Sequence, residues 1–218
     1  MCVPRQVRAE GVADCSGAGG HGVVEKPCVT DRGVGRARAE RARAAGVTLQ
    51  VGHIERFNPA VRTLSNIVPD LDILAVDAHR LGPPVERDGR ENVVLDLMIH
   101  DIDIVRSLLG SEPTDVTAST TADGDYTSAR CTFEDGVVGS FTASRVTQQK
   151  IRQLGITCRE CRIIVDYIDQ SVEIHRSATP SYVQEDGDLR HTTESVVERP
   201  LVESGEPLKA ELASFVSA

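Results

Sequence analysis

The chain has 218 residues, of which 40% are apolar and 26% charged, a balance typical of a globular protein with a buried core. Its formal net charge of −9 argues against a nucleic-acid partner, because phosphate binding requires clustered lysine and arginine side chains. The sequence contains no long apolar run that predicts a membrane span and no signal-peptide segment at its start, so we expect a cytoplasmic location.

The first candidate motif in chain order is a G-x-G-x-x-G match at residues 17–22. A dinucleotide-binding fingerprint requires a strand before these glycines and a helix after them. Here VADCS precedes the match and the extended segment VVEKP follows it. The surroundings are the reverse of those required, so we reject this match as a phosphate-binding turn.

Residues 23–54 have the order strand, helix, strand. The Ala- and Arg-rich segment 31–45 predicts an exposed helix, Gly46 suits its C-terminal cap, and VTLQVGHI at 47–54 predicts a second strand. This order is the βαβ unit of a parallel sheet. Asn58-Pro59 marks a turn, so we predict a partial nucleotide-binding domain over 1–58 and a second domain over 59–218.

The second domain has the pattern of a mostly antiparallel sheet, because short turns join its later strands. One long helix, closed by Gly110, interrupts the strands at 92–109, whereas the polar segment 177–206 predicts loop and edge, and another helix begins at EPLKAEL. The fold class is therefore α/β plus α+β, with the C-terminal remnant of a Rossmann parallel sheet followed by an open antiparallel sheet. The predicted strands are 71–81, 114–122, 125–133, 137–147, 151–157, 161–168 and 171–176.

Cys158 and Cys161 have C-x-x-C spacing, but no second pair or nearby histidine completes a zinc set. We interpret this segment as a turn between two strands rather than as a metal or redox site.

The helix at 92–109 carries the strongest candidate for chemistry. Most of its circumference is apolar, while Asp96, His100 and Asp103 share one narrow polar face at i, i+4 and i+7. This face has three interpretations: a solvated stripe, a proton-transfer pair in which Asp96 orients His100, or two metal ligands that lack further partners.

Two further segments place polar residues at the C-terminal edge of the predicted parallel strands, where open α/β sheets bind ligands. VVEKP places Lys26 there, and a cis bond before Pro27 would direct its side chain; the alternative is a surface strand end. GHIERFNPAV brings His53, Arg56 and Asn58 to the same edge, and an arginine suits a phosphate or carboxylate. The alternative for this second segment is an interdomain hinge.

Together, VVEKP, GHIERFNPAV and DLMIHDIDIV resemble the Gfo/Idh/MocA family of oxidoreductases. The sequences of these motifs are most similar to the branch of the family that acts on nucleotide-linked amino sugars. The resemblance implies hydride transfer between NAD or NADP and a sugar or nucleotide-sugar carbon, and homo-oligomers formed through the C-terminal sheet. It implies catalytic roles for Lys26, Asp96 and His100. It also implies cofactor contacts and substrate contacts, which we assign respectively to Glu25, Lys26 and Pro27, and to Arg56, Asn58 and Asp103.

The sequence departs from the family pattern at both ends. The family's first strand, glycine-rich turn and first helix have no counterpart, and the chain stops inside the EPLKAEL helix. We therefore expect a truncated enzyme. The alternatives are a non-catalytic fragment or binding module that oligomerises, and a metal-dependent hydrolase or lyase built on Asp96 and His100.

Overall fold

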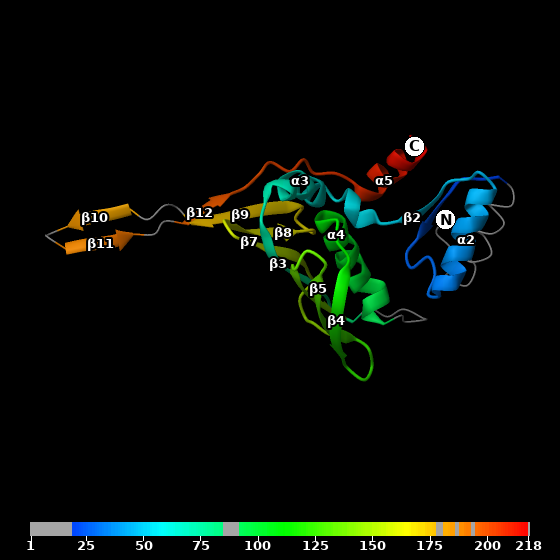
Figure 1. Cartoon of the computed structure of the whole chain (residues 1–218), viewed down its shortest axis with the longest axis horizontal. Coiled ribbons are helices and arrows are strands. Elements are labelled where there is room, and N and C mark those ends of the chain that lie inside the picture. The colour runs from blue at the N-terminus through cyan, green and yellow to red at the C-terminus, as the bar shows by residue number, and fades with distance from the viewer. Residues whose placement is uncertain (1–18, 85–91, 178–180, 186–187, 193–194, 218) are drawn as a thin grey trace. The chain divides into compact units, whose positions relative to one another are not determined.

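The computed structural model describes residues 19–84, 92–177, 181–185, 188–192 and 195–217 (Figure 1). Its chain forms two compact units. The first combines the described residues up to Phe57 with those from Glu206 onward, and the second comprises Asn58–Gly205. The units differ from the predicted domains in two respects: Asn58 belongs to the second unit, and the C-terminal helix groups with the first unit.

The first unit contains a parallel β-α-β arrangement, as the sequence predicted. Strands β1 (Gly22–Glu25) and β2 (Leu49–Gly52) pair in parallel, and helix α2 (Arg32–Ala44) connects them. The carboxylate of Asp31 caps α2 by accepting a hydrogen bond of 2.9 Å from the Val34 amide. Since β1 begins at Gly22, no helix follows the rejected glycine motif; Gly17 lies outside the described residues. Two further elements complete the unit: the short 3₁₀ helix η1 (Ile54–Phe57) and helix α5 (Pro207–Val216), which packs against η1.

The second unit is built on an eight-stranded sheet in the order β12-β9-β8-β7-β3-β6-β5-β4. Within the described chain, β3 and β6 form its one parallel pair, and every other neighbouring pair is antiparallel. The predicted mostly antiparallel sheet is therefore confirmed. Its strands are β3 (Ile73–Leu81), β4 (Pro113–Thr120), β5 (Tyr126–Phe133), β6 (Val138–Ser144), β7 (Ile151–Cys158), β8 (Cys161–Asp166), β9 (Ser171–Ser177) and β12 (Ser195–Glu198).

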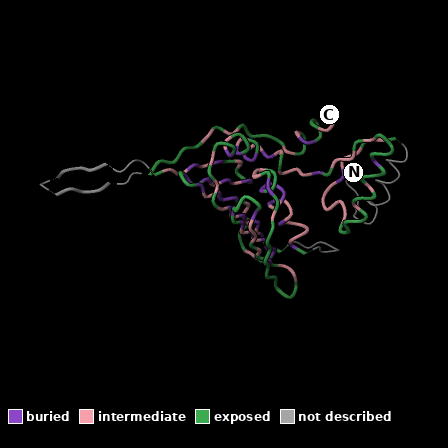
Figure 2. The backbone as a smooth tube through the Cα atoms, in the orientation of Figure 1, coloured by how far each residue is buried: buried purple, intermediate pink, exposed green. Residues whose placement is uncertain are grey.

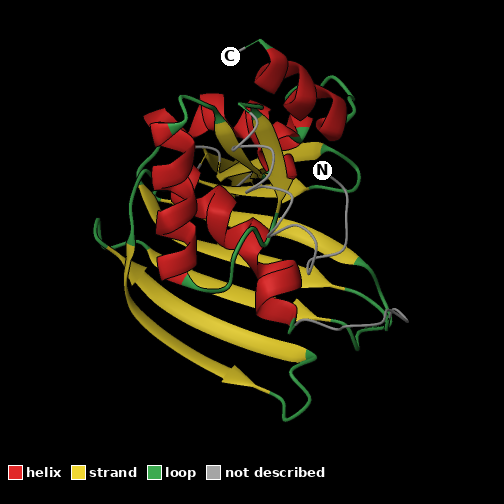
Figure 3. Cartoon of the chain, turned by 90° about the vertical axis from the view of Figure 1, so that its right-hand side faces the viewer, coloured by secondary structure: helices red, strands yellow, loops and turns green. Residues whose placement is uncertain are grey.

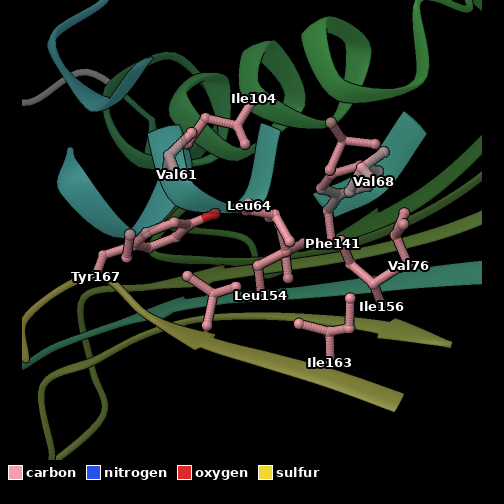
Figure 4. Close-up of a cluster of buried hydrophobic side chains, with 14 of the residues drawn as sticks. Val61, Leu64, Val68, Val76, Ile104, Phe141, Leu154, Ile156, Ile163 and Tyr167 are labelled. Atoms are coloured by element: carbon pink, nitrogen blue, oxygen red, sulfur yellow. The ribbon is translucent and has the colours of Figure 1, made fainter. Parts of the chain in front are cut away.

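Helices cover one face of this sheet (Figure 3). They are α3 (Pro59–Ile67), the 3₁₀ turn η2 (Val68–Asp70), the π-helical turn η3 (Val94–Met98) and α4 (Ile99–Leu109). Buried and more exposed residues alternate along β3 and β8, because successive side chains of a strand point to opposite faces (Figure 2). The aliphatic core lies between the helices and the covered face, with Leu64, Ile104, Leu154 and Ile163 among its buried residues (Figure 4).

The helix predicted over 92–109 is present, and it begins with a π-helical turn, because one extra residue fits into the turn at Val94–Met98. One prediction about secondary structure was wrong. The segment 177–206, predicted as loop and edge, contains an antiparallel hairpin as well as the edge strand β12. Its strands are β10 (Ser181–Glu185) and β11 (Asp188–Thr192). Pairing with a neighbouring strand supports these polar strands, which have little apolar alternation of their own. None of the described helices is long and apolar enough to cross a membrane.

Candidate active site

Lys26 directly follows β1, at the edge where the parallel strands β1 and β2 end. The Lys26–Pro27 peptide bond is cis, and Glu25, Lys26 and Pro27 are all partly buried. The sequence placed these three residues at the C-terminal edge of a parallel sheet, and the strand pairing confirms that placement.

A buried carboxyl group that the sequence did not single out belongs to the same unit. Glu211 of α5 is fully buried. Burial raises the pKa of Glu211, and the nearby Glu25 carboxylate raises it further, whereas the backbone and ring of His53 act in the opposite direction. Glu25 extends over Gly52, where an added Cβ would lie 3.3 Å from Cδ of Glu25.

The sequence does carry a signal for this buried acid. Glu211 lies four residues after Pro207 and four before Phe215, and these three are the more buried positions along that side of α5. An acidic residue on the inward stripe of a helix indicates a carboxyl group without access to water.

The GHIERFNPAV segment contains two candidate substrate-binding residues, of which Arg56 is exposed and Asn58 is buried. The side-chain oxygen of Asn58 accepts a hydrogen bond from the Ala60 amide at 3.1 Å, and its side-chain nitrogen donates to the Tyr167 carbonyl at 3.0 Å. Asn58 therefore caps α3 and connects it to the turn after β8. The substrate contacts of Arg56 and Asn58 stay predictions.

Asp96 lies in the π-helical turn, and His100 is the second residue of α4. Such turns occur frequently at functional sites, because the extra residue changes the direction of the side chains around it. Oδ2 of Asp96 accepts a hydrogen bond of 2.7 Å from Nη2 of Arg145. Nη1 of the same arginine lies 3.7 Å from Oδ1 of Asp125. Arg145 was not among the residues that the sequence singled out.

A second ion pair fixes α4 to the sheet. Arg80 of β3 donates two hydrogen bonds to Asp101, at 2.8 and 2.9 Å, and the two residues are only 3% and 2% exposed. The guanidinium carbon of Arg80 also lies 5.3 Å from the centre of the Tyr167 ring, within the range of a cation–π contact. Asp103, the third acid of the predicted polar face, is also buried. The interpretation of this face as a solvated stripe therefore does not hold for Asp103, which is 6% exposed.

The C-x-x-C segment forms the turn between β7 and β8, as predicted, since these strands pair antiparallel on either side of it. Both thiols are buried, and burial together with the neighbouring Cys161 raises the pKa of Cys158 to about 12. A thiol held in its protonated form is a poor nucleophile and a poor metal ligand.

Residues 75–166 match the model of the GFO/IDH/MocA C-terminal domain. The chain is also 33% identical to UDP-N-acetylglucosamine 3-dehydrogenase of Acidithiobacillus ferrooxidans over 169 residues, which are 74% of this chain and 53% of that protein. The chain belongs to the Gfo/Idh/MocA family. The crystal structure of the Acidithiobacillus enzyme matches with a TM-score of 0.86 and 27% identity, covering 99% of this chain and 67% of that one.

The chain is also similar to inositol 2-dehydrogenase of Rhizobium meliloti, with 28% identity over 184 residues, or 81% of this chain and 54% of that protein. The chain thus spans about half the length of the curated relatives that it matches. The matched family segment includes Asp96, His100 and Arg145, whereas Lys26 precedes it.

Proposed function

We propose that this protein is an NAD(P)-dependent oxidoreductase that transfers hydride between a nicotinamide and a hydroxyl-bearing carbon of a sugar or nucleotide sugar. The observation that supports it best is the D-x-x-x-H segment at a π-helical turn, with Asp96 bound to a buried arginine. The names of the relatives support the substrate class, because they refer to a nucleotide sugar and to inositol.

In the oxidation direction, His100 takes the proton of the substrate hydroxyl, and the carbinol becomes a carbonyl. Asp96 orients the imidazole and stabilises its protonated form. A bound nicotinamide would supply the acceptor for the hydride that leaves the same carbon. Lys26 would hold the nicotinamide ribose through its ammonium group. In the reverse direction, His100 returns the proton to the oxygen.

The residues of the first unit suit one end of such a cofactor. Glu25, Lys26 and Pro27 lie at the C-terminal ends of parallel strands, the usual ligand-binding edge of an open α/β sheet. The N-terminus of α2 is capped by the carboxylate of Asp31, which would repel a pyrophosphate. We therefore assign the nicotinamide end to Glu25, Lys26 and Pro27. No residues of the described chain are assigned to the pyrophosphate.

Substrate contacts are proposed for Arg56, Asn58 and Asp103. The exposed guanidinium of Arg56 suits the diphosphate of a nucleotide sugar. Asn58 and Asp103 are buried, so any contact they make with substrate requires a ligand that reaches beneath the surface of its unit. Binding measurements would determine whether the cofactor is NAD or NADP and which sugar is the substrate.

The first experiment is a titration of the purified chain with NADH and with NADPH, followed by nicotinamide fluorescence, and then a screen of sugar nucleotides and polyols for turnover. The variants K26A and H100A should each lower kcat by roughly 10²–10⁴-fold. The matched controls K150A and H175A alter an exposed lysine and a partly exposed histidine of the second unit and should leave kcat unchanged. Absence of binding at millimolar cofactor by the folded chain would contradict the proposed activity.

A second candidate function is assembly into homo-oligomers through the sheet. The face of the sheet opposite α3 and α4 carries partly exposed charged groups, including an ion pair of 3.0 Å between Arg162 and Asp77 and one of 2.8 Å between Arg199 and Glu173. Light scattering after gel filtration would test it: R162E should reduce the mass of an oligomer, whereas a monomeric wild type would rule this candidate out.

A further inference from the structure

Arg145 is a nearly buried cation placed between two acids from different parts of the second unit. It directly follows β6 and is 9% exposed. Its Nη2 donates to Asp96 at 2.7 Å, and its Nη1 lies 3.7 Å from Asp125, which precedes β5. One guanidinium thus joins the π-helical turn to the turn between β4 and β5.

The backbone around Arg145 holds it in place. The Arg145 amide donates a hydrogen bond of 2.9 Å to the Asp125 carbonyl. The fully buried Ser144 before it accepts hydrogen bonds through its hydroxyl from the Val146 amide at 3.1 Å and from the Thr147 hydroxyl at 2.8 Å. These bonds fix the chain on both sides of Arg145, so its side chain leaves the sheet from a rigid base.

The π-helical turn is attached to the same turn of the sheet. The Asn92 side chain accepts a hydrogen bond from the Leu95 amide at 3.0 Å and caps the first residues of the helix. The Val93 amide donates to the Gly124 carbonyl at 3.3 Å, one residue before Asp125. These hydrogen bonds therefore fix the position of the Asp96 backbone relative to the sheet, and the contact with Arg145 determines the direction of the Asp96 carboxylate.

We propose that Arg145 is a positioning residue that holds the Asp96 carboxylate in a fixed orientation. It acts on His100 through Asp96 and does not touch the substrate. The planar guanidinium suits this task, because it presents several N–H donors in a rigid fork and reaches two carboxylates at once. A lysine ammonium has the same charge but is a single point, and it cannot span both acids. The part of this proposal that concerns turnover rests on the proposed function.

The test follows the ring signals of His100 by NMR in the 218-residue chain across pH, and it needs neither cofactor nor turnover. The variants are R145Q, R145K, D96N and the double variant D96N/R145Q. R106Q is the matched control, because Arg106 pairs with Glu112 near the other end of α4. Should R145Q lose its fold, R145K and D125N carry the same test.

If Arg145 acts through Asp96, R145K keeps the positive charge but no longer directs the Asp96 carboxylate, so the midpoint of the His100 titration falls. R145Q also removes the positive charge, so its effect on the midpoint should differ between the wild-type and D96N backgrounds. R106Q should leave the midpoint unchanged. An R145K midpoint equal to that of the wild type, or an equal effect of R145Q with and without Asp96, would overturn the proposal.

Turnover provides a second measurement that separates this proposal from the proposed function. R145K should lower kcat by roughly 10- to 100-fold through misplacement of the acid, with KM changed much less. Coupling between residues 145 and 96 in a chain without turnover would support the positioning role and refute the activity. Normal turnover in R145K would refute the positioning role and leave the activity intact.

Discussion

The buried ion pair between Arg80 and Asp101 allows a quantitative test of how the second unit is held together. Replacing Arg80 by methionine keeps an apolar stem of similar length but leaves the Asp101 carboxylate without its two hydrogen bonds, at a site that is 2% exposed. Removing one partner of a buried pair costs about 3–5 kcal/mol of the free energy of unfolding. Loss of the contact with the Tyr167 ring adds about 0.5–2 kcal/mol.

The double variant R80M/D101L separates the energy of the pair from that of the isolated charges. Replacing a buried pair with apolar residues of similar volume is often neutral or stabilising, so we expect the double variant to be more stable than either single variant. The coupling free energy between the two positions should then be about 3 kcal/mol or more. The exposed pair of Arg159 and Asp72 is the control, and R159M should cost at most about 1 kcal/mol.

Hydrogen exchange of the Ile156 and Ile163 amides is the suitable assay. Both residues are buried in adjacent central strands, so their exchange reports the opening of the second unit by itself. A denaturation curve of the whole chain would mix two compact units. Single variants within about 0.5 kcal/mol of the wild type, or a double variant that loses the sum of the two single losses, would refute the reasoning.

Two further predictions concern stability. Because the pKa of Glu211 is raised in the folded state, its contribution to stability is complete at pH values below the ordinary range of a glutamate and is lost as pH rises through the folded-state value. E211Q should remove this loss, so its melting temperature should depend less on pH than that of the wild type, and a wild type and variant with parallel melting temperatures from pH 4 to pH 8 would contradict the prediction. L154A truncates a side chain of zero exposure in the core and should lower the free energy of unfolding by about 2–5 kcal/mol, measured by hydrogen exchange; a loss below about 1 kcal/mol would show that the core closes over the cavity.

The local elements were predictable because each leaves its pattern within a short segment. The strand–helix–strand order before Asn58 and the turn at Cys158–Cys161 follow from period and turn residues, and both are present. The position of Lys26 at the end of a parallel strand follows from the same reasoning. The ordered motifs were also sufficient to indicate the Gfo/Idh/MocA family, to which the chain belongs.

Only the tertiary structure decided which charges meet. Arg145 and Asp96 are 49 positions apart, and Arg80 and Asp101 are 21 apart, and no periodic pattern relates residues at such separations. The place of β3 between β6 and β7 is likewise a long-range choice, made by the pairing of strands that are distant in sequence. The sequence by itself determined which residues could carry chemistry, whereas packing determined their partners, because burial makes an unpaired charge too costly to leave without one.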